Sequence, residues 1–247
     1  MKVLGGFQFG QMTFELLPIE GRFKATLGDV CMGFVAIVFG NTGNGKTEVC
    51  LDMADYFRSL DMGDVAWVSY EQRHGYDLQK GWKRKGLHIN RPGHSSALVI
   101  DPIANRKPGV SLIEDLYEYL KKKNSPKFVF IDSIDYLKIK FEEYATYLKE
   151  AFPTKNFIFL SHAKGNMPKS SIGEKIMYDG GLGLYVHKYI AYVAKNRFGG
   201  FEPYVIYEER ARALNPDFFA KKLKADAQGK LPLDGEKAPE KEAETPA

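Results

Sequence analysis

The chain has 247 residues, of which 44% are hydrophobic and 27% charged, and a formal net charge of +4, values that fit one large globular domain or two small ones. Its longest apolar stretch, residues 34–39, is far shorter than the ~18 residues of a membrane helix, and no long apolar run follows the N-terminus as in a signal peptide. The two cysteines, Cys31 and Cys50, form no C-x-x-C pair, so we expect a reduced, cytoplasmic protein with neither zinc nor membrane contact.

The first predicted strand, 34–39, leads into the most specific motif of the chain. Residues 40–47, Gly-Asn-Thr-Gly-Asn-Gly-Lys-Thr, match the phosphate-loop (P-loop) pattern G-x-x-x-x-G-K-[ST] in full. The backbone N–H groups of such a loop surround the β-phosphate of a nucleotide, and the following helix adds its N-terminal dipole. Lys46 is expected to reach the β- and γ-phosphates, and the Thr47 hydroxyl is expected to bind Mg²⁺. The residues predicted to bind the nucleotide are Gly40, Asn41, Thr42, Gly43, Asn44, Gly45, Lys46, Thr47 and Glu48.

A predicted helix, 49–60, separates this motif from the second strand, 65–69. Glu71 lies just beyond that strand, where a carboxylate can polarise the water that attacks a phosphate. By itself, Glu71 fits an exposed loop residue better. A basic run at 80–85 contains Trp82, which either stacks on a nucleobase or anchors a solvated helix in the core, and the second interpretation is favoured.

The fourth predicted strand ends in an acid. It spans 128–132 and follows a short strand at 97–100 and a helix at 111–123, which begins with a capping box. A carboxylate at the carboxyl end of a buried strand lies beside the phosphate loop in an open α/β sheet. Asp132 is therefore expected to hold Mg²⁺ through water, with Asp135 as a weaker alternative.

The remaining elements complete an α/β pattern. A helix is predicted over 141–152 and a strand over 157–161, whereas two β-rich runs, 184–194 and 204–208, follow Gly183. Alternating strands and helices predict a mostly parallel central sheet flanked by helices. The last two runs predict antiparallel strands added to one edge of that sheet near the C-terminus.

The order of these motifs resembles that of the RecA-like P-loop ATPase superfamily. The five residues Ser-His-Ala-Lys-Gly from Ser161 resemble the sensor segment of RadA/Sms-type DNA repair proteins. Residues 195–199 reproduce the KNRFG motif of the same proteins, and DnaB-type replicative helicases carry a related K-x-R element. The resemblance covers about residues 25–210, and the ATPase core of RadA/Sms-type proteins is the closest match, with the DnaB-type helicase core next.

The resemblance implies roles for four further residues. Glu71 orients the attacking water. His162, or Ser161 beside it, contacts the γ-phosphate and senses its loss. Lys195 and Arg197 reach the γ-phosphate of a neighbouring subunit, where a permanently charged guanidinium stabilises the charge that develops.

The same resemblance implies DNA as the partner. Residues 163–181 are rich in Gly and Ser, carry Lys164, Lys169 and Lys175, and match the position of the central DNA-binding loop in RecA-like proteins. Flexible glycines with lysines suit a phosphate backbone that is bound without reading its sequence.

These expectations define a Mg²⁺-dependent ATP hydrolase that acts on single-stranded DNA in recombination, repair or replication. It would form a homo-oligomer, a ring or a filament, whose active sites are shared between subunits. Two alternatives stay open: a replicative-type DNA helicase motor core, and an ATP-switched oligomeric binding or signalling protein without DNA contact. A small-molecule kinase is disfavoured because nothing resembles a substrate lid.

The predicted domain organisation has three parts. Residues 1–24 form an N-terminal extension, 25–224 the RecA-like ATPase domain, and 225–247 an acidic tail. The tail has almost no large apolar residues and is predicted to be disordered, because it cannot bury enough surface to offset its ordering entropy. The basic remainder suits a polyanion-binding surface, or its charge serves solubility alone.

Overall fold

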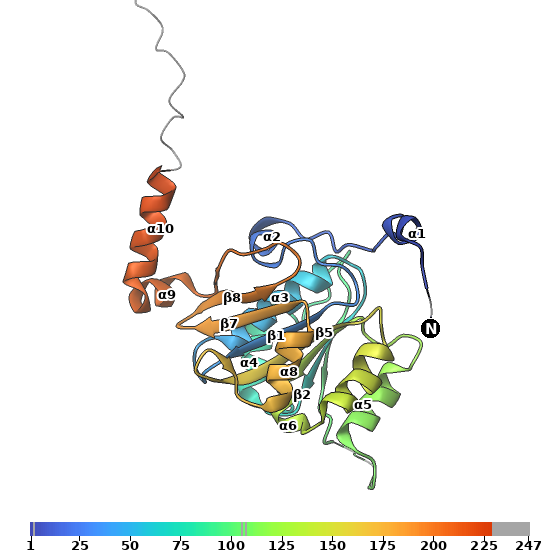
Figure 1. Cartoon of the computed structure of the whole chain (residues 1–247). Helices are drawn as coiled ribbons and strands as arrows, with labels where there is room; N and C mark the ends of the chain where they lie inside the picture. Colours follow the sequence, from blue (N-terminus) through green and yellow to red (C-terminus); the bar gives the residue numbers. More distant parts are fainter. Residues whose placement is uncertain (2, 105, 107, 229–247) are drawn as a thin grey trace, which may run out of the picture.

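A nine-stranded sheet forms the centre of the structure, a computed structural model that describes residues 1, 3–104, 106 and 108–228 (Figure 1). The strands are β1 (Val35–Gly40), β2 (Val65–Ser69), β3 (Ala97–Ile100), β4 (Phe128–Asp132), β5 (Asn156–Lys164), β6 (Met167–Pro168), β7 (Leu182–His187), β8 (Ile190–Asn196) and β9 (Tyr204–Val205). Their order is β3-β2-β4-β5-β1-β7-β8-β9, with β6 paired to β5 off this path. The six strands from β3 to β7 in this order are parallel, whereas β8 and β9 are antiparallel. This sheet confirms the predicted fold class.

Helices cover both faces of the sheet. They are α1 (Gly6–Gly10), α2 (Gly21–Leu27), α3 (Lys46–Ser59), α4 (Tyr76–Arg84), α5 (Leu112–Leu120), α6 (Ile134–Leu137), α7 (Phe141–Tyr144), the π-helix η1 (Ala145–Glu150), α8 (Ser171–Asp179), α9 (Glu208–Leu214) and α10 (Pro216–Gln228). One core packs α2, α3 and α4 against the sheet, and the other packs α5 to α8 with η1 against the opposite face. Along β1, Ala36 and Val38 enter the first core, while Ile37 and Phe39 enter the second. The continuous apolar runs of the sequence therefore reflect burial on both faces.

The strand predictions differ from the structure at several places. The run 204–208 is a strand only over Tyr204–Val205, and β5 extends beyond the predicted 157–161 to Asn156–Lys164. Residues 97–100 form the edge strand β3, which is half-buried rather than buried on both faces, because an edge strand has a neighbour on one side only. The run 184–194 is two strands, not one antiparallel strand, and β7 pairs in parallel with β1. A parallel neighbour needs a crossover connection, which α8 supplies. The turn between β7 and β8 contains Lys188 and Tyr189, both in the left-handed region at φ 47° and 63°.

The basic run 80–85 is part of a helix that Trp82 anchors in the core, the second of the two interpretations given above. Trp82 is buried on α4 and packs in the core, as favoured from the sequence. The cations that follow form ion pairs with α3: Arg84 contacts Glu48, and the Lys85 amine lies 2.6 Å from an Asp52 oxygen.

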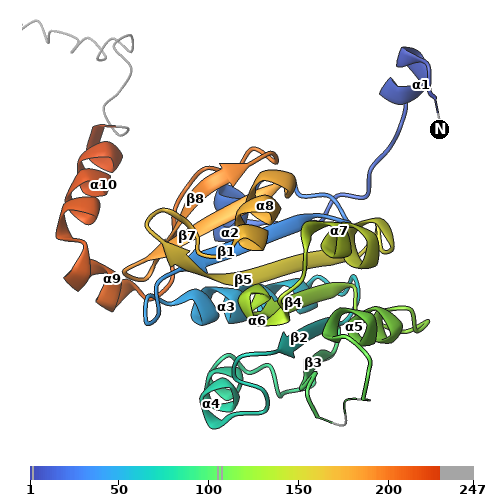
Figure 2. The ribbon, with the colours of Figure 1, turned by 60° about the horizontal axis from the view of Figure 1, so that its bottom comes forward.

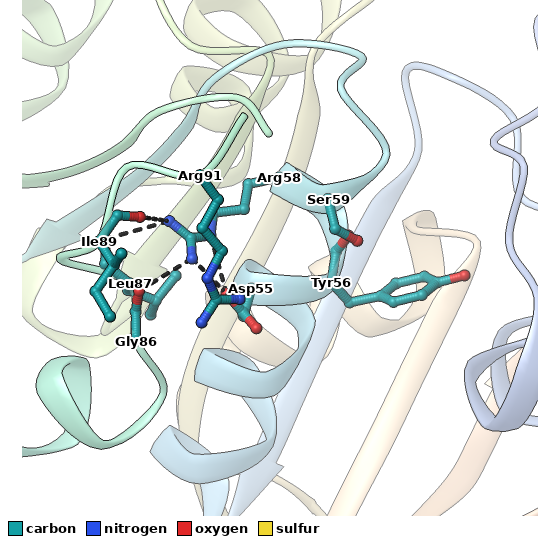
Figure 3. Close-up of polar contacts among 8 residues, drawn as sticks. All are labelled: Asp55, Tyr56, Arg58, Ser59, Gly86, Leu87, Ile89 and Arg91. Atoms are coloured by element: carbon teal, nitrogen blue, oxygen red, sulfur yellow. Dashed lines mark hydrogen bonds and ion pairs between the residues drawn. The ribbon is translucent and has the colours of Figure 1, made fainter. Parts of the chain in front are cut away.

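A buried arginine fixes the C-terminal end of α3 to the segment after α4. Arg58 is 2% exposed, and its guanidinium donates to the carbonyls of Gly86, at 3.0 Å, and Ile89, also at 3.0 Å (Figure 3). The Asp55 carboxylate accepts from Arg58 Nε at 2.9 Å and neutralises the charge. These bonds hold in place the helix whose first turn carries the phosphate loop.

Helices lie across both predicted domain boundaries, since α2 spans Gly21–Leu27 and α10 spans Pro216–Gln228. Leu17, Ile19 and Phe23 are buried in the α3-side core, although they lie within the predicted extension 1–24. Figures 1 and 2 show α1 projecting on one side of the molecule and α9 with α10 leaving on the other. Helix α10 continues to Gln228, and the rest of the predicted tail lies outside the described residues. Among the described helices, none is long and apolar enough to cross a membrane.

Candidate nucleotide site

The phosphate loop connects the end of β1 to the start of α3, as the motif predicts. Gly45 is the N-cap of α3 and has φ 101°, a left-handed conformation that favours glycine. A close approach also requires glycine at position 40, where a Cβ would lie 2.2 Å from the Val186 carbonyl oxygen of β7, and a Cβ at Gly45 would be in tight contact with the Tyr189 ring at 3.1 Å. The loop is therefore packed against β7 and the β7–β8 turn.

The parallel register brings the predicted catalytic groups to one edge of the sheet. Gly40 pairs with His162, and Ser69, two residues before Glu71, pairs with Asp132. Because the carboxyl ends of parallel strands meet at the same edge, these side chains surround a pocket of about 280 Å³. The residues that line it are Thr42, Gly43, Gly45, Lys46, Thr47, Glu48, Glu71, Gln72, Asp132, His162 and Tyr189.

Opposite charges meet inside this pocket. Burial, together with the neighbouring Glu71 charge, raises the pKa of Asp132 from 3.8 to about 7, against the opposing effects of Trp67 and Lys46. Burial lowers the pKa of Lys46, whereas Glu71 and Asp132 act in the opposite direction. The Lys46 amine is thus held beside two acidic side chains in a partly desolvated site.

Backbone and side-chain contacts fix Glu71. Its backbone N–H donates to the Asp132 carbonyl at 3.0 Å, which joins the segment after β2 to the end of β4. The Glu71 carboxylate lies 3.6 Å from His162 Nε2. The acid and the imidazole therefore form a pair that faces the phosphate loop.

The two alternative residues, Asp135 and Ser161, are hydrogen-bonded to each other. The Asp135 carboxylate accepts from the Ser161 hydroxyl at 3.2 Å and from the His162 backbone N–H at 2.8 Å. Neither Ser161 nor Asp135 lines the pocket, whereas His162 and Asp132 do. The geometry thus favours His162 over Ser161 as the sensor candidate and Asp132 over Asp135 as the metal-binding candidate.

The side chains of Asp132 and Thr47 in this pocket suit Mg²⁺ as ligands. Asp132 Oδ2 is buried, and among the described residues it has no hydrogen-bond partner. The Thr47 hydroxyl lines the same pocket. A hard cation that binds one hydroxyl, water and phosphate oxygens would supply the missing partner for the carboxylate. No group of three or more Asp, Glu, His or Cys able to hold a metal occurs in the described part of the chain, so nucleotide phosphates would have to complete the coordination.

Lys195 and Arg197 lie far from the pocket of their own chain. Lys195 lies within β8 and Arg197 directly follows it. The end of β8 pairs with the start of β7 at Leu182, whereas Gly40, at the start of the phosphate loop, pairs with Val186. These two positions on β7 are four residues apart, which separates the sites by roughly 13 Å along the strands. The Lys195 amine donates to the carbonyls of Met177 and Tyr178 at the end of α8.

Of the predicted nucleotide-binding residues, three do not line the pocket. Gly40 abuts β7, and the Asn41 carbonyl accepts from the Lys46 amine at 3.2 Å. The Asn44 side-chain oxygen accepts from the Lys188 backbone N–H at 2.7 Å. Sequence analysis missed Gln72 and Tyr189. No motif marks Tyr189, which reaches the loop only through the β7–β8 turn.

The strand order, the phosphate loop between β1 and α3, and the acid at the end of β4 define a RecA-like P-loop fold. Two solved structures share it. Flagellar accessory protein FlaH from Methanocaldococcus jannaschii aligns with a TM-score of 0.55 and 16% identity over 77% of this chain and 92% of that one. The KaiC-like protein PH0186 from Pyrococcus horikoshii aligns with a TM-score of 0.53 and 18% identity over 78% and 93%.

At 16% and 18% sequence identity, the likeness to these two structures shows the fold alone. No family model and no curated protein sequence matches the chain. The predicted closeness to RadA/Sms-type proteins stays a prediction.

Proposed function

We propose that the protein is a Mg²⁺-dependent ATP hydrolase. The observation that carries this proposal is the convergence of Lys46, Glu71 and Asp132 on one pocket beside a complete phosphate loop. Structural likeness to other RecA-like proteins supports a nucleotide-binding core.

Each group has a chemical task in water attack on the γ-phosphate. The backbone N–H groups of the loop and the Lys46 amine bind the phosphates and offset their charge. The Glu71 carboxylate, anchored through its own backbone, orients the attacking water. His162 lies close enough to Glu71 to respond to the loss of the γ-phosphate. Mg²⁺, held by Thr47 and through water by Asp132, would supply charge neutralisation at the β- and γ-phosphates.

The proposed active site is completed by a second copy of the chain. None of the described residues that line the pocket is an arginine, and Lys195 and Arg197 lie near the amino end of β7, whereas the phosphate loop follows the carboxyl end of β1. A head-to-tail homo-oligomer, a ring or a filament, would bring the Arg197 end of one copy to the phosphate loop of the next.

We further propose single-stranded DNA as the partner, in recombination, repair or replication. The support comes from the β5–β6 hairpin, which carries the exposed Lys164 and Lys169, and whose Lys169 N–H donates to the His162 carbonyl at 2.8 Å. Helix α8 occupies much of the segment 163–181 and buries Ile176, so a flexible loop over that whole segment is wrong. The hairpin and the exposed Lys175 of α8 are the parts of this segment proposed to contact DNA.

Turnover measurements test the catalytic proposal. Glu71→Gln should retain ATP binding and lower turnover by about 10²- to 10⁴-fold, because an oriented carboxylate is lost while the phosphate loop is intact. Lys46→Ala should abolish hydrolysis, with the circular dichroism spectrum unchanged. Near-normal turnover in Glu71→Gln would remove this residue from the mechanism.

The effect of DNA on turnover separates the alternatives. ATPase rate is measured with and without single-stranded DNA at several salt concentrations, and stimulation that falls steeply with salt supports phosphate contacts. Strand displacement of a duplex would instead identify a helicase motor core. Turnover indifferent to DNA would identify an ATP-switched oligomer without DNA contact. Lys164→Glu and Lys169→Glu should lower the stimulation, with Lys123→Glu as the control on a distant exposed site.

A further inference from the structure

The segment that carries Glu71 begins between the ends of two neighbouring strands. The sheet order places β4 on one side of β2 and the edge strand β3 on the other (Figure 2). The strand registers pair Ser69 with Asp132 on β4, and they bring Asp101, the residue that follows β3, level with Ser69 on the other side. The chain that leaves β2 therefore has Asp132 on one side and Asp101 on the other.

Both strand ends bind this segment. On the β4 side, the backbone N–H groups of residues 70 and 71 donate to the Asp132 carbonyl, at 2.6 and 3.0 Å. On the β3 side, Arg73 Nε donates to both oxygens of the Asp101 carboxylate, at 3.1 and 3.0 Å. We call this second contact the Arg73–Asp101 clamp. The segment is thus held at residues 70–71 and again at residue 73.

The Asp101 carboxylate is a fixed anchor for this clamp. Its side chain is 8% exposed, and its Oδ1 also accepts from the backbone N–H groups of Ile103 and Ala104, at 3.0 and 3.1 Å. Burial raises the pKa of Asp101, but the bonds from Arg73 and from these two N–H groups outweigh burial and hold the pKa below its ordinary value. The carboxylate is therefore ionised at neutral pH and is oriented by its own loop as well as by Arg73.

The clamp also fixes the path of the chain directly after Glu71. Arg73 has φ 51°, in the left-handed region, which residues with a Cβ rarely adopt. Such a conformation persists where surrounding contacts impose it, and it is frequent at functional sites. The turn is closed by the Gly75 N–H, which donates to the Gln72 carbonyl at 2.9 Å. The side chains of Glu71 and Gln72, which line the phosphate pocket, are therefore presented from a short segment that is bound at both ends.

The energetics of the clamp suit orientation better than overall stability. The Arg73 side chain is 51% exposed, and ion pairs with an exposed partner contribute little to the free energy of unfolding. Turnover is more sensitive, since a displacement of about 1 Å between reacting groups costs on the order of 10²-fold. Neither Arg73 nor Asp101 lines the phosphate pocket.

On the basis of the function proposed above, we propose that Arg73 and Asp101 are positioning residues that hold the Glu71 carboxylate in the geometry of water attack. They act through Glu71 and contact neither the nucleotide nor the water. The clamp therefore sets the rate of turnover and leaves the affinity for ATP nearly unchanged.

Steady-state turnover and ATP binding of Arg73→Asn test this proposal. Asparagine tolerates the left-handed backbone, so the variant removes the guanidinium without new backbone strain. We expect kcat to fall about 10- to 100-fold, with ATP affinity within about threefold of wild type. Arg212→Asn is the matched control, because Arg212 is 52% exposed in an ion pair with Glu208 and should keep kcat within about twofold.

A double variant shows whether the effect passes through Glu71. In the Glu71→Gln background, Arg73→Asn should lower turnover by less than about threefold, because residues that act as a unit do not have additive effects. An equal loss in both backgrounds would overturn the proposal. The same holds for an ATP affinity that falls as much as kcat does, and for a kcat of Arg73→Asn within about threefold of wild type.

Amide hydrogen exchange of the nucleotide-free protein provides a readout besides activity. The peptide that covers residues 70–76 should exchange faster in Arg73→Asn than in wild type or Arg212→Asn, while the peptides of α3 and β4 keep their rates. Unchanged exchange over residues 70–76 would overturn the proposal.

Asp101→Asn is a second variant that keeps the fold of the anchor. Its amide oxygen still accepts from the Ile103 and Ala104 N–H groups, whereas the charge that binds Arg73 is lost. It should show the same pattern as Arg73→Asn with a smaller loss of kcat, and it decides the question if Arg73→Asn does not fold.

Failure of the clamp and failure of the proposed function give different results. If Glu71→Gln turns over ATP at a near-normal rate, the proposed role of Glu71 fails, and the clamp fails with it. If Glu71→Gln is impaired while Arg73→Asn and Asp101→Asn are not, the clamp alone is wrong.

Discussion

At the scale of single residues, Asp132 is a candidate cation ligand whose side chain is buried. Its side chain is buried at the end of β4, close to Glu71, and this environment penalises the charged form. An acid retained under such a penalty is characteristic of functional sites, where the stability of the protein is lowered in favour of binding. Cation binding would offset the penalty, since it favours the ionised carboxylate.

The pKa of Asp132 predicts how stability depends on pH. In the absence of nucleotide and Mg²⁺, the folded protein keeps the Asp132 proton up to pH of about 7, whereas the unfolded chain releases it near 3.8. The folded state binds more protons between these values, so this group lowers the free energy of unfolding as pH rises from about 4 to about 7. Asp132→Asn cannot ionise and should remove this dependence, which raises the free energy of unfolding at pH 8 by on the order of 1–4 kcal/mol.

Urea denaturation from pH 5 to pH 8 in the presence of a chelator measures this effect. The amide variant should also lose Mg²⁺-dependent hydrolysis. A difference between variant and wild type that does not change with pH would show that Asp132 is ionised in the free protein.

At the scale of elements, Arg58 connects α3 to the segment after α4 by binding main-chain carbonyls of that segment. Its guanidinium satisfies oxygens in the segment 86–89 and pairs with Asp55 (Figure 3). A planar fork with several N–H donors matches this arrangement, whereas a lysine ammonium cannot reach all of these acceptors at once. The C-terminal end of α3 is therefore fixed by a group that sequence patterns assign to the surface.

Substitution of Arg58 should lower the free energy of unfolding. Arg58→Met leaves buried carbonyls without a donor and leaves the Asp55 carboxylate only Arg91, at 3.7 Å, so we expect a loss of about 3–5 kcal/mol in the free energy of unfolding. Arg58→Lys should recover only part of it. Arg212→Met is the matched control: its side chain is 52% exposed in an ion pair with Glu208 on the same helix, and the expected loss is about 0.5 kcal/mol or less.

Urea denaturation of the three variants compares these losses directly. A loss below about 1 kcal/mol for Arg58→Met would show that water replaces the bonds to the guanidinium.

At the scale of the whole molecule, the two halves of the proposed active site lie at opposite ends of the strands of one sheet. The phosphate loop follows the carboxyl end of β1, and Arg197 lies near the amino end of β7. In a single copy, Arg197 contacts the end of α8, where its backbone N–H donates to Gly181 and its side chain to Tyr178. Turnover should therefore depend on the assembly of copies and not only on the folding of each one.

Mixing two inactive variants tests this arrangement. Arg197→Ala should bind ATP normally and lose about 10³- to 10⁵-fold in turnover, the effect of removing an arginine that acts on the γ-phosphate. A mixture with Lys46→Ala should regain part of the activity, because some junctions then pair an intact phosphate loop with an intact Arg197. A mixture that co-assembles and stays inactive would contradict a shared site, as would full specific activity in a dilute monomer.

Local patterns were sufficient to predict much of the architecture. The P-loop motif predicted that residues 40–47 lie between a strand and a helix, and the apolar run 128–132 predicted the strand β4 with an acid at its end. These predictions succeed because the phosphate loop and a strand buried on both faces depend on residues adjacent in sequence. The capping box at Ser111 was likewise readable from four residues and is present in α5.

The tertiary structure decided what depends on distant pairings. Only the strand order reveals that β7 is parallel to β1, since its sequence is equally apolar in either direction. Tyr189 reaches the phosphate loop because Asn44 binds the β7–β8 turn, 144 residues away from it along the chain. Arg58 is buried because the segment after α4 folds back over it. The sequence by itself determined the chemistry of the phosphate loop and the class of fold, and the packing of remote segments decided which further side chains surround the nucleotide, because those contacts exist only once the sheet is assembled.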